Sequence, residues 1–141
     1  MKEIVSRKTS GIILIICLLT LMVFHILVIL KILPSNIVWD GQMDNGLSVL
    51  FLEIAALVLT AFFILIAAAK TGYIKSHRLR KAANAGIWVI VVFFSFNIAG
   101  NLMAKTYLEK LVFTPLSILM VICSIRLATK SNIKGSQFIK E

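Results

Sequence analysis

Four long apolar runs, at 10–33, 46–69, 83–103 and 111–128, constrain this chain more than any other feature. An α-helix rises about 1.5 Å per residue, so about 20 apolar residues cross the roughly 30 Å of hydrocarbon in a bilayer. Only a helix satisfies its backbone hydrogen bonds within one spanning segment, and the runs lack the alternation of a β-barrel. The sequence therefore predicts an all-α, polytopic membrane protein, with four transmembrane helices bundled into one domain, 1–141.

The composition supports this class and excludes others. Hydrophobic residues make up 60% of the 141 positions, which is more apolar surface than a soluble domain can bury. The first run is about twice as long as the apolar core of a signal peptide and has no small-x-small cleavage site, so we expect it to remain a helix. Nucleic acid binding is not expected, because no folded soluble module is present to carry the basic residues.

Lysine and arginine are distributed unevenly along the chain. Of the fifteen, three precede the first run, five lie between the second and third, four lie at or after the end of the fourth, and three lie at the opposite helix ends. The positive-inside rule predicts a multi-pass cell-membrane protein with both termini in the cytoplasm. The basic segment 70–81, which includes His77, is also expected to contact anionic lipid head groups.

Few residues in the chain suit a cofactor. Cys17 and Cys123 fall in the cytoplasmic halves of their predicted helices, where a disulfide is not expected. We expect both to act as small apolar fillers. A metal site would need more ligands at one depth than the chain offers, so no metal and no cofactor is predicted.

The predicted outer loop after the first run reads "PSNIVWDGQMDNG". Pro34 is expected to stop the first helix, and the "DG" and "NG" pairs favour turns. Trp39 suits the lipid–water interface, although it and Asp40 are also candidates for the mouth of a pocket.

Polar side chains recur at one depth in all four predicted helices. Counting back from the outer helix ends puts this layer about 9–12 Å below the outer boundary. The layer consists of His25, Glu53, Asn97 and Ser117, with Asn101 and Thr114 nearer the surface. Residues three or four apart share a helix face, and small or polar faces pack against neighbouring helices in a membrane. We therefore expect these residues to face the interior.

Glu53 is predicted to be the only acid within a membrane span. A carboxylate at this depth costs several kcal/mol if it is charged and unpaired. His25 is the only ionisable base predicted at the same depth, so we expect a Glu53–His25 pair flanked by Asn97 and Asn101. The layer would then be either a ligand site or a structural clasp between helices.

The leading interpretation is a polar pocket in the outer half that binds a small ligand, a lipid head group or a partner's helix. The first alternative is a small proton- or cation-coupled transporter that works as an oligomer, although the inner half offers little polar path. The second is a membrane enzyme with Glu53 and His25 as acid and base, but no nucleophile triad or zinc motif supports it, and no catalytic residue is assigned. The chain is compatible with a monomer, a homodimer or a membrane partner.

Two segments, "HILVILKILPSNIVWDGQM" and "FNIAGNLMAKTYLEKLVFTPLS", together with Glu53 resemble a family of small bacterial four-helix membrane proteins with no known activity. In that family the loop reads Trp-Gly-Gly-Arg, where this chain has Asp40 and Gln42 around Gly41. The lost arginine removes the basis for an anion site in the loop. The positions to which the resemblance draws attention are His25, Trp39, Glu53, Asn97 and Asn101.

Overall fold

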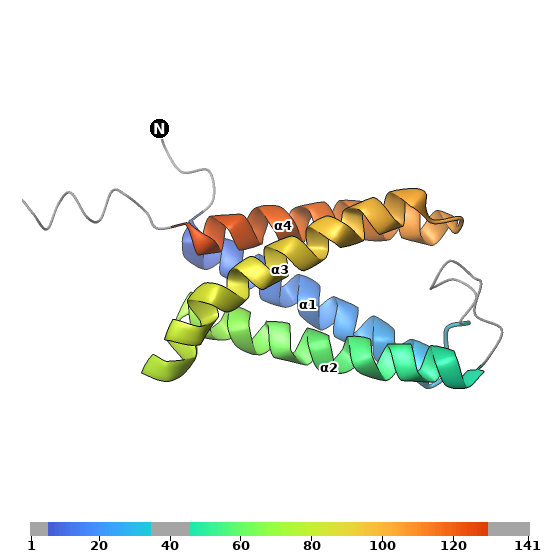
Figure 1. Cartoon of the computed structure of the whole chain (residues 1–141), viewed down its shortest axis with the longest axis horizontal. Helices are drawn as coiled ribbons and strands as arrows, with labels where there is room; N and C mark the ends of the chain where they lie inside the picture. The colour runs from blue at the N-terminus through green and yellow to red at the C-terminus, as the bar shows by residue number, and fades with distance from the viewer. Residues whose placement is uncertain (1–5, 35–45, 130–141) are drawn as a thin grey trace, which may run out of the picture.

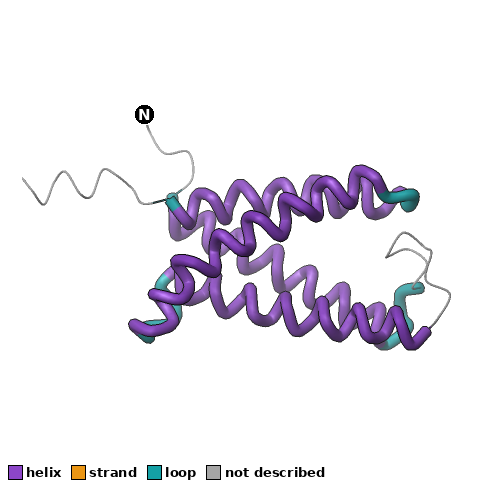
Figure 2. The backbone as a smooth tube through the Cα atoms, in the orientation of Figure 1, coloured by secondary structure: helices purple, strands orange, loops and turns teal. Residues whose placement is uncertain are grey.

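The computed structural model describes residues 6–34 and 46–129, and the regular structure in both ranges is entirely helical (Figure 2). The elements are α1 (Arg7–Ile29), α2 (Gly46–Thr71), α3 (His77–Met103), the π-helix η3 (Glu109–Phe113) and α4 (Thr114–Ala128). With η3 and α4 taken together, the described chain contains four helical segments long and apolar enough to cross a membrane. The predicted all-helical class with four potential spans is confirmed.

The helices form two antiparallel hairpins, α1–α2 and α3–α4 (Figure 1). The hairpins pack together because α1 also contacts α4 and α2 also contacts α3. One end of the bundle, which we call the basic end, holds the start of α1, the end of α4 and the α2–α3 connection. The opposite end, the far end, holds the end of α1, the start of α2 and the α3–η3 connection. The two hairpins diverge toward the far end (Figure 1).

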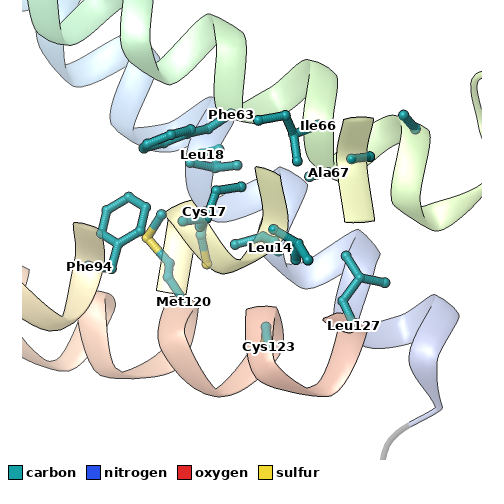
Figure 3. Close-up of a cluster of buried hydrophobic side chains, with 14 residues drawn as sticks. Leu14, Cys17, Leu18, Phe63, Ile66, Ala67, Phe94, Met120, Cys123 and Leu127 are labelled. Atoms are coloured by element: carbon teal, nitrogen blue, oxygen red, sulfur yellow. The ribbon is translucent and has the colours of Figure 1, made fainter. Parts of the chain in front are cut away.

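An apolar core drawn from all four helices fills the half of the bundle nearer the basic end (Figure 3). Leu14, Leu18, Ile87 and Ile90 are completely shielded from solvent within it. Both cysteines are free and buried in the same core, as expected of small apolar fillers. This packing fixes how the hairpins meet, because close-packed interiors tolerate little change in side-chain volume.

The outward faces of the helices are apolar as well. Leu47, Phe51 and Phe96 are 83%, 72% and 74% exposed. Such surfaces are costly in water but are solvated by lipid tails, so the exposed Leu, Ile, Val and Phe side chains suit a bilayer.

The small and polar faces of the helices point inward, as predicted from their spacing. Glu53 of α2 and Ser117 of α4, which were expected to face the interior, are both buried. Thr60 and Ala67 of α2 and Ser124 of α4 are buried as well. The sequence pattern therefore gave the correct rotation of both helices.

The first helix begins and ends earlier than the predicted 10–33. The hydroxyl of Ser6 caps its N-terminus. At the other end Lys31 adopts a left-handed conformation, with φ 59°, and the amide of Ile32 donates to the carbonyl oxygen of Leu27 at 3.0 Å. This Schellman geometry ends the helix before the chain reaches Pro34, so the prediction that Pro34 is the stop is wrong.

The second and third helices both extend beyond the apolar runs that predicted them. Helix α2 continues two residues past 69, and Gly72, with φ 103°, follows its end. Helix α3 begins at His77, six residues before the predicted start, with Ser76 at its N-cap position. His77 and the basic residues after it were expected in a loop but are helical. Hydropathy marks only the part of a helix suited to lipid, and Arg, Lys and Leu are good helix formers in any surroundings.

The fourth helical segment starts before the predicted 111, in the π-helix η3. The amide of Thr114 donates to the carbonyl oxygen of Glu109, five residues back, instead of four. Pro115 follows directly, and a proline has no amide hydrogen and its ring crowds the carbonyl four residues before it. The widened turn accommodates that ring. It also brings Glu109 into the fourth helical segment, so Glu53 is not the only acid in the four candidate spans.

Close approach of α1 to α2 gives a test of this packing. A Cβ atom added at Gly11 would lie 2.2 Å from Oγ1 of Thr71, whose hydroxyl is held by a 2.6 Å bond to the carbonyl oxygen of Ala67. We expect Gly11→Ala to lower the free energy of unfolding in detergent by about 1–3 kcal/mol through overpacking. Gly100→Ala is the control, because nothing lies within 4 Å of its added Cβ, and it should stabilise by about 0.5–1 kcal/mol. Equal effects of both changes would contradict the α1–α2 contact.

Candidate functional site

A cavity of about 140 Å³ lies between the four helices, on the far side of the apolar core from the basic end. We call it the acidic cavity, after its two carboxylates. Its polar lining consists of His25, Glu53, Thr60, Asn97, Asn101, Glu109 and Ser117. Five of these seven are residues of the predicted polar layer, and the structure brings them together around one space.

His25 and Glu53 are in direct contact at this cavity. Nδ1 of His25 lies 2.7 Å from Oε2 of Glu53. Glu53 is 1% exposed and the side chain of His25 is 13% exposed. The predicted pair is confirmed, and it joins α1 to α2. A proton lies between the two groups whether the pair is neutral or ionic, and this bond offsets part of the cost of burying a carboxylate.

Of the two asparagines on α3, Asn97 makes a hydrogen bond within its own helix and Asn101 makes one to α4. The amide nitrogen of Asn97 donates to the carbonyl oxygen of Phe93 at 3.2 Å, within its own helix. The amide nitrogen of Asn101 donates to the hydroxyl of Ser117 at 3.4 Å. Both asparagines line the cavity, and Asn101 also connects the two helices of the second hairpin.

Glu109 is a functional candidate that the sequence analysis missed. It lines the cavity from η3, and the hydroxyl of Thr106 donates to its carboxylate. The signal for it was present, because Thr106 and Glu109 have the spacing of a capping box, Thr-x-x-Glu, just before an apolar run. Recognising that motif would have started the helix near 106 and placed a second acid on its first turn.

One predicted site residue among those that the structure describes is not at the cavity. Thr114 is buried but does not line it, and its hydroxyl donates to the carbonyl oxygen of Glu109 at 3.2 Å. Its role is to support η3. Trp39 and Asp40 lie outside the described residues, so their predicted place at the mouth of a pocket stays a prediction.

Aromatic rings form much of the apolar wall. Phe24 and Phe113 meet edge to face with ring centroids 5.0 Å apart, and Phe93 and Phe94 do the same at 5.2 Å. All four rings line the cavity. Apolar walls with a few convergent polar groups are typical of small-molecule sites. Within 6–34 and 46–129, no group of three His, Cys, Asp or Glu residues is placed to hold a metal ion.

Comparison of the chain with protein-family models, with curated proteins and with solved structures found no match. The interpretation of the site therefore rests on its geometry and chemistry.

A double-mutant cycle tests the His25–Glu53 pair. His25→Leu and Glu53→Leu should each destabilise the protein in detergent by about 1–3 kcal/mol, because each removes a hydrogen-bond partner from a polar group inside the bundle. The double variant should be less destabilised than the sum of the two, by about 0.5–3 kcal/mol.

The control cycle pairs His25→Leu with Thr60→Val. Thr60 also lines the cavity, but its hydroxyl donates to the carbonyl oxygen of Ala56 in its own helix, at 2.7 Å. These two changes should add. Additive effects in the His25–Glu53 cycle as well would show that the pair contributes no coupling energy.

Proposed function

We propose that this chain is an integral membrane protein that binds a small organic amine in the acidic cavity. The observation that carries the proposal is the excess of hydrogen-bond acceptors on the polar wall. Glu53 and Glu109 both line the cavity. An ionised carboxylate is an acceptor only, with about four lone-pair sites, so these two residues add acceptor sites to the wall and no donors.

Some of the side-chain donors on the same wall are already in use. The hydroxyl of Thr60 donates within α2, and the amide nitrogens of Asn97 and Asn101 each donate to a protein oxygen. A ligand that binds the two carboxylates must supply donors of its own. An ammonium group supplies up to three donors and a positive charge, and hydrogen bonds between charged partners are about twice as strong as neutral ones.

The remaining walls favour an apolar body of limited size. The cavity of about 140 Å³ is close to the roughly 150 Å³ that accommodates a benzene molecule. Phe24 and Phe113 add ring surface beside the carboxylates, and aromatic rings attract cations. A benzylamine-sized molecule combines these features.

Binding accounts for the geometry better than transport does. The His25–Glu53 pair is the feature that favours a proton-coupled transporter, since a hydrogen-bonded pair of ionisable side chains lies inside the bundle. However, Leu14, Leu18 and Ile90 are completely shielded in the core between this cavity and the basic end. A ligand would have to pass through that core to cross the bilayer.

We also infer that the basic end faces the cytoplasm and that the acidic cavity lies in the outer half of the bilayer. The support is the unequal distribution of Lys and Arg between the two ends.

Thermal unfolding of the purified protein in detergent tests the ligand class, with benzylamine and its neutral analogue benzyl alcohol as probes at pH 7. Benzylamine should raise the unfolding temperature in a saturable way, as any ligand of the folded state does. Glu109→Gln keeps the shape and removes the charge, so it should weaken benzylamine binding roughly tenfold.

Lys110→Gln is the control, because it changes a charge one residue away but outside the cavity lining. It should leave both probes unaffected. The amine proposal fails if benzylamine and benzyl alcohol stabilise the wild type equally, or if neither does. Uptake of benzylamine into protein-containing liposomes, lost in Glu53→Gln, would favour transport over binding alone.

Cysteine labelling tests the orientation. Lys105 and Ser76 are exposed at opposite ends of the bundle, and native Cys17 and Cys123 are buried. With intact cells and an impermeant thiol reagent, Lys105→Cys should react and Ser76→Cys should not. The opposite pattern would reverse the inferred topology while leaving the fold unchanged.

A further inference from the structure

A second cavity lies at the basic end, and four of its six lining residues are Lys or Arg. It has a volume of about 640 Å³ and is formed by the start of α1, the end of α2 and the start of α3. Its lining consists of Arg7, Lys70, His77, Arg80, Lys81 and Asn84. We propose that this basic cavity is a binding site for a phosphate group, independent of the amine site proposed above.

Two of the cations are held in place by the fold. The ammonium of Lys70 donates to the side-chain oxygen of Asn84 and so joins α2 to α3. Nη2 of Arg7 donates to the carbonyl oxygen of Leu127 at 3.1 Å and so joins α1 to α4. Side chains that are already ordered lose less conformational entropy when a ligand binds, which favours affinity.

The basic cavity has no acidic residue in its lining. The two carboxylates among the described residues, Glu53 and Glu109, both line the acidic cavity instead. Arg7 is partly buried, and its Nε is buried with no hydrogen-bond partner within the described chain. A cluster of cations is electrostatically unfavourable when no anion is present, and removing part of a guanidinium from water adds a desolvation cost. A bound anion would offset both costs.

The start of α3 adds to the positive potential at this cavity. The first turn of α3 has no acidic residue, and the side chain of Ser76 makes no capping hydrogen bond. A helix N-terminus carries a partial positive charge, so the basic residues placed there oppose the helix dipole. Phosphate binds favourably at such a terminus, and here it would also contact the cations that define the cavity.

Membrane topology alone does not account for this arrangement. The positive-inside rule depends on how many Lys and Arg residues a connection carries, not on where their side chains meet. Lys75 and Arg78 belong to the same basic segment and are exposed, but they do not line the cavity. The convergence of cations from three helices on one space is therefore a separate feature, and these two residues give a matched control.

The shared chemistry of the ligand is a phosphate oxyanion, which arginine and lysine both recognise. Its source is either a soluble phosphate compound or the head group of a phospholipid. Two arms of one experiment distinguish them, both using thermal unfolding of the full-length protein in detergent. The first arm adds pyrophosphate at constant ionic strength. The second compares mixed micelles containing phosphatidic acid with micelles containing phosphatidylcholine.

We expect a saturable rise in unfolding temperature in at least one arm. A rise in the first arm identifies a soluble phosphate ligand, and a rise in the second arm alone identifies a lipid head group. Arg80→Gln/Lys81→Gln should weaken the response roughly tenfold or more, because two cations next to the anion are lost. Lys75→Gln/Arg78→Gln removes the same charge from the same segment and should leave the response unchanged.

Two results would overturn the proposal: no saturable response of the wild type in either arm, or equal loss in both double variants. The second result would mean that only the overall charge of the segment matters. Circular dichroism checks that the variants are folded. If Arg80→Gln/Lys81→Gln does not fold, Lys81→Gln alone, at an exposed position, replaces it.

Discussion

The contact between His25 and Glu53 is the interaction on which the far half of this bundle depends. A carboxylate that is 1% exposed inside an apolar bundle needs a partner, and the imidazole 2.7 Å away supplies one. Their contact requires the end of α1 and the start of α2 to lie side by side, which sets the register of the first hairpin. The second hairpin then closes the space around the pair with Asn97, Asn101 and Ser117, and so makes a cavity where a tightly packed protein would place apolar side chains.

Charge is separated along the length of the bundle. Both described carboxylates line the acidic cavity toward the far end, whereas Arg7, Lys70 and Arg80 line the cavity at the basic end. The apolar core lies between the two sets and keeps them apart. Each cavity is therefore free to select its own ligand by charge, an amine at one and a phosphate at the other under the proposals made here.

The π-helix η3 shows how one residue changes the chemistry of a site from outside it. Pro115 does not line the acidic cavity, but it cannot continue a regular α-helical hydrogen-bond pattern. The widened turn before it carries both Glu109 and Phe113 on the cavity wall. π-Bulges are frequent at functional sites, and here the bulge supplies an acid and an aromatic ring to the same space.

The helical class, the four potential spans and the inward rotation of α2 and α4 follow from the amino-acid sequence alone, because hydrophobic length and helical spacing are local properties. The sequence also predicted the Glu53–His25 contact, since those were the two ionisable groups predicted at one depth. Helix ends were less predictable: Lys31 ends α1 through a backbone conformation unusual for lysine, and α3 extends into a basic segment that hydropathy does not mark. The packing of the helices, in contrast, places Glu109 at the cavity, keeps Thr114 out of its lining and brings cations from three helices together at the basic end. Those outcomes depend on how helices distant in the chain pack together, which no local pattern records.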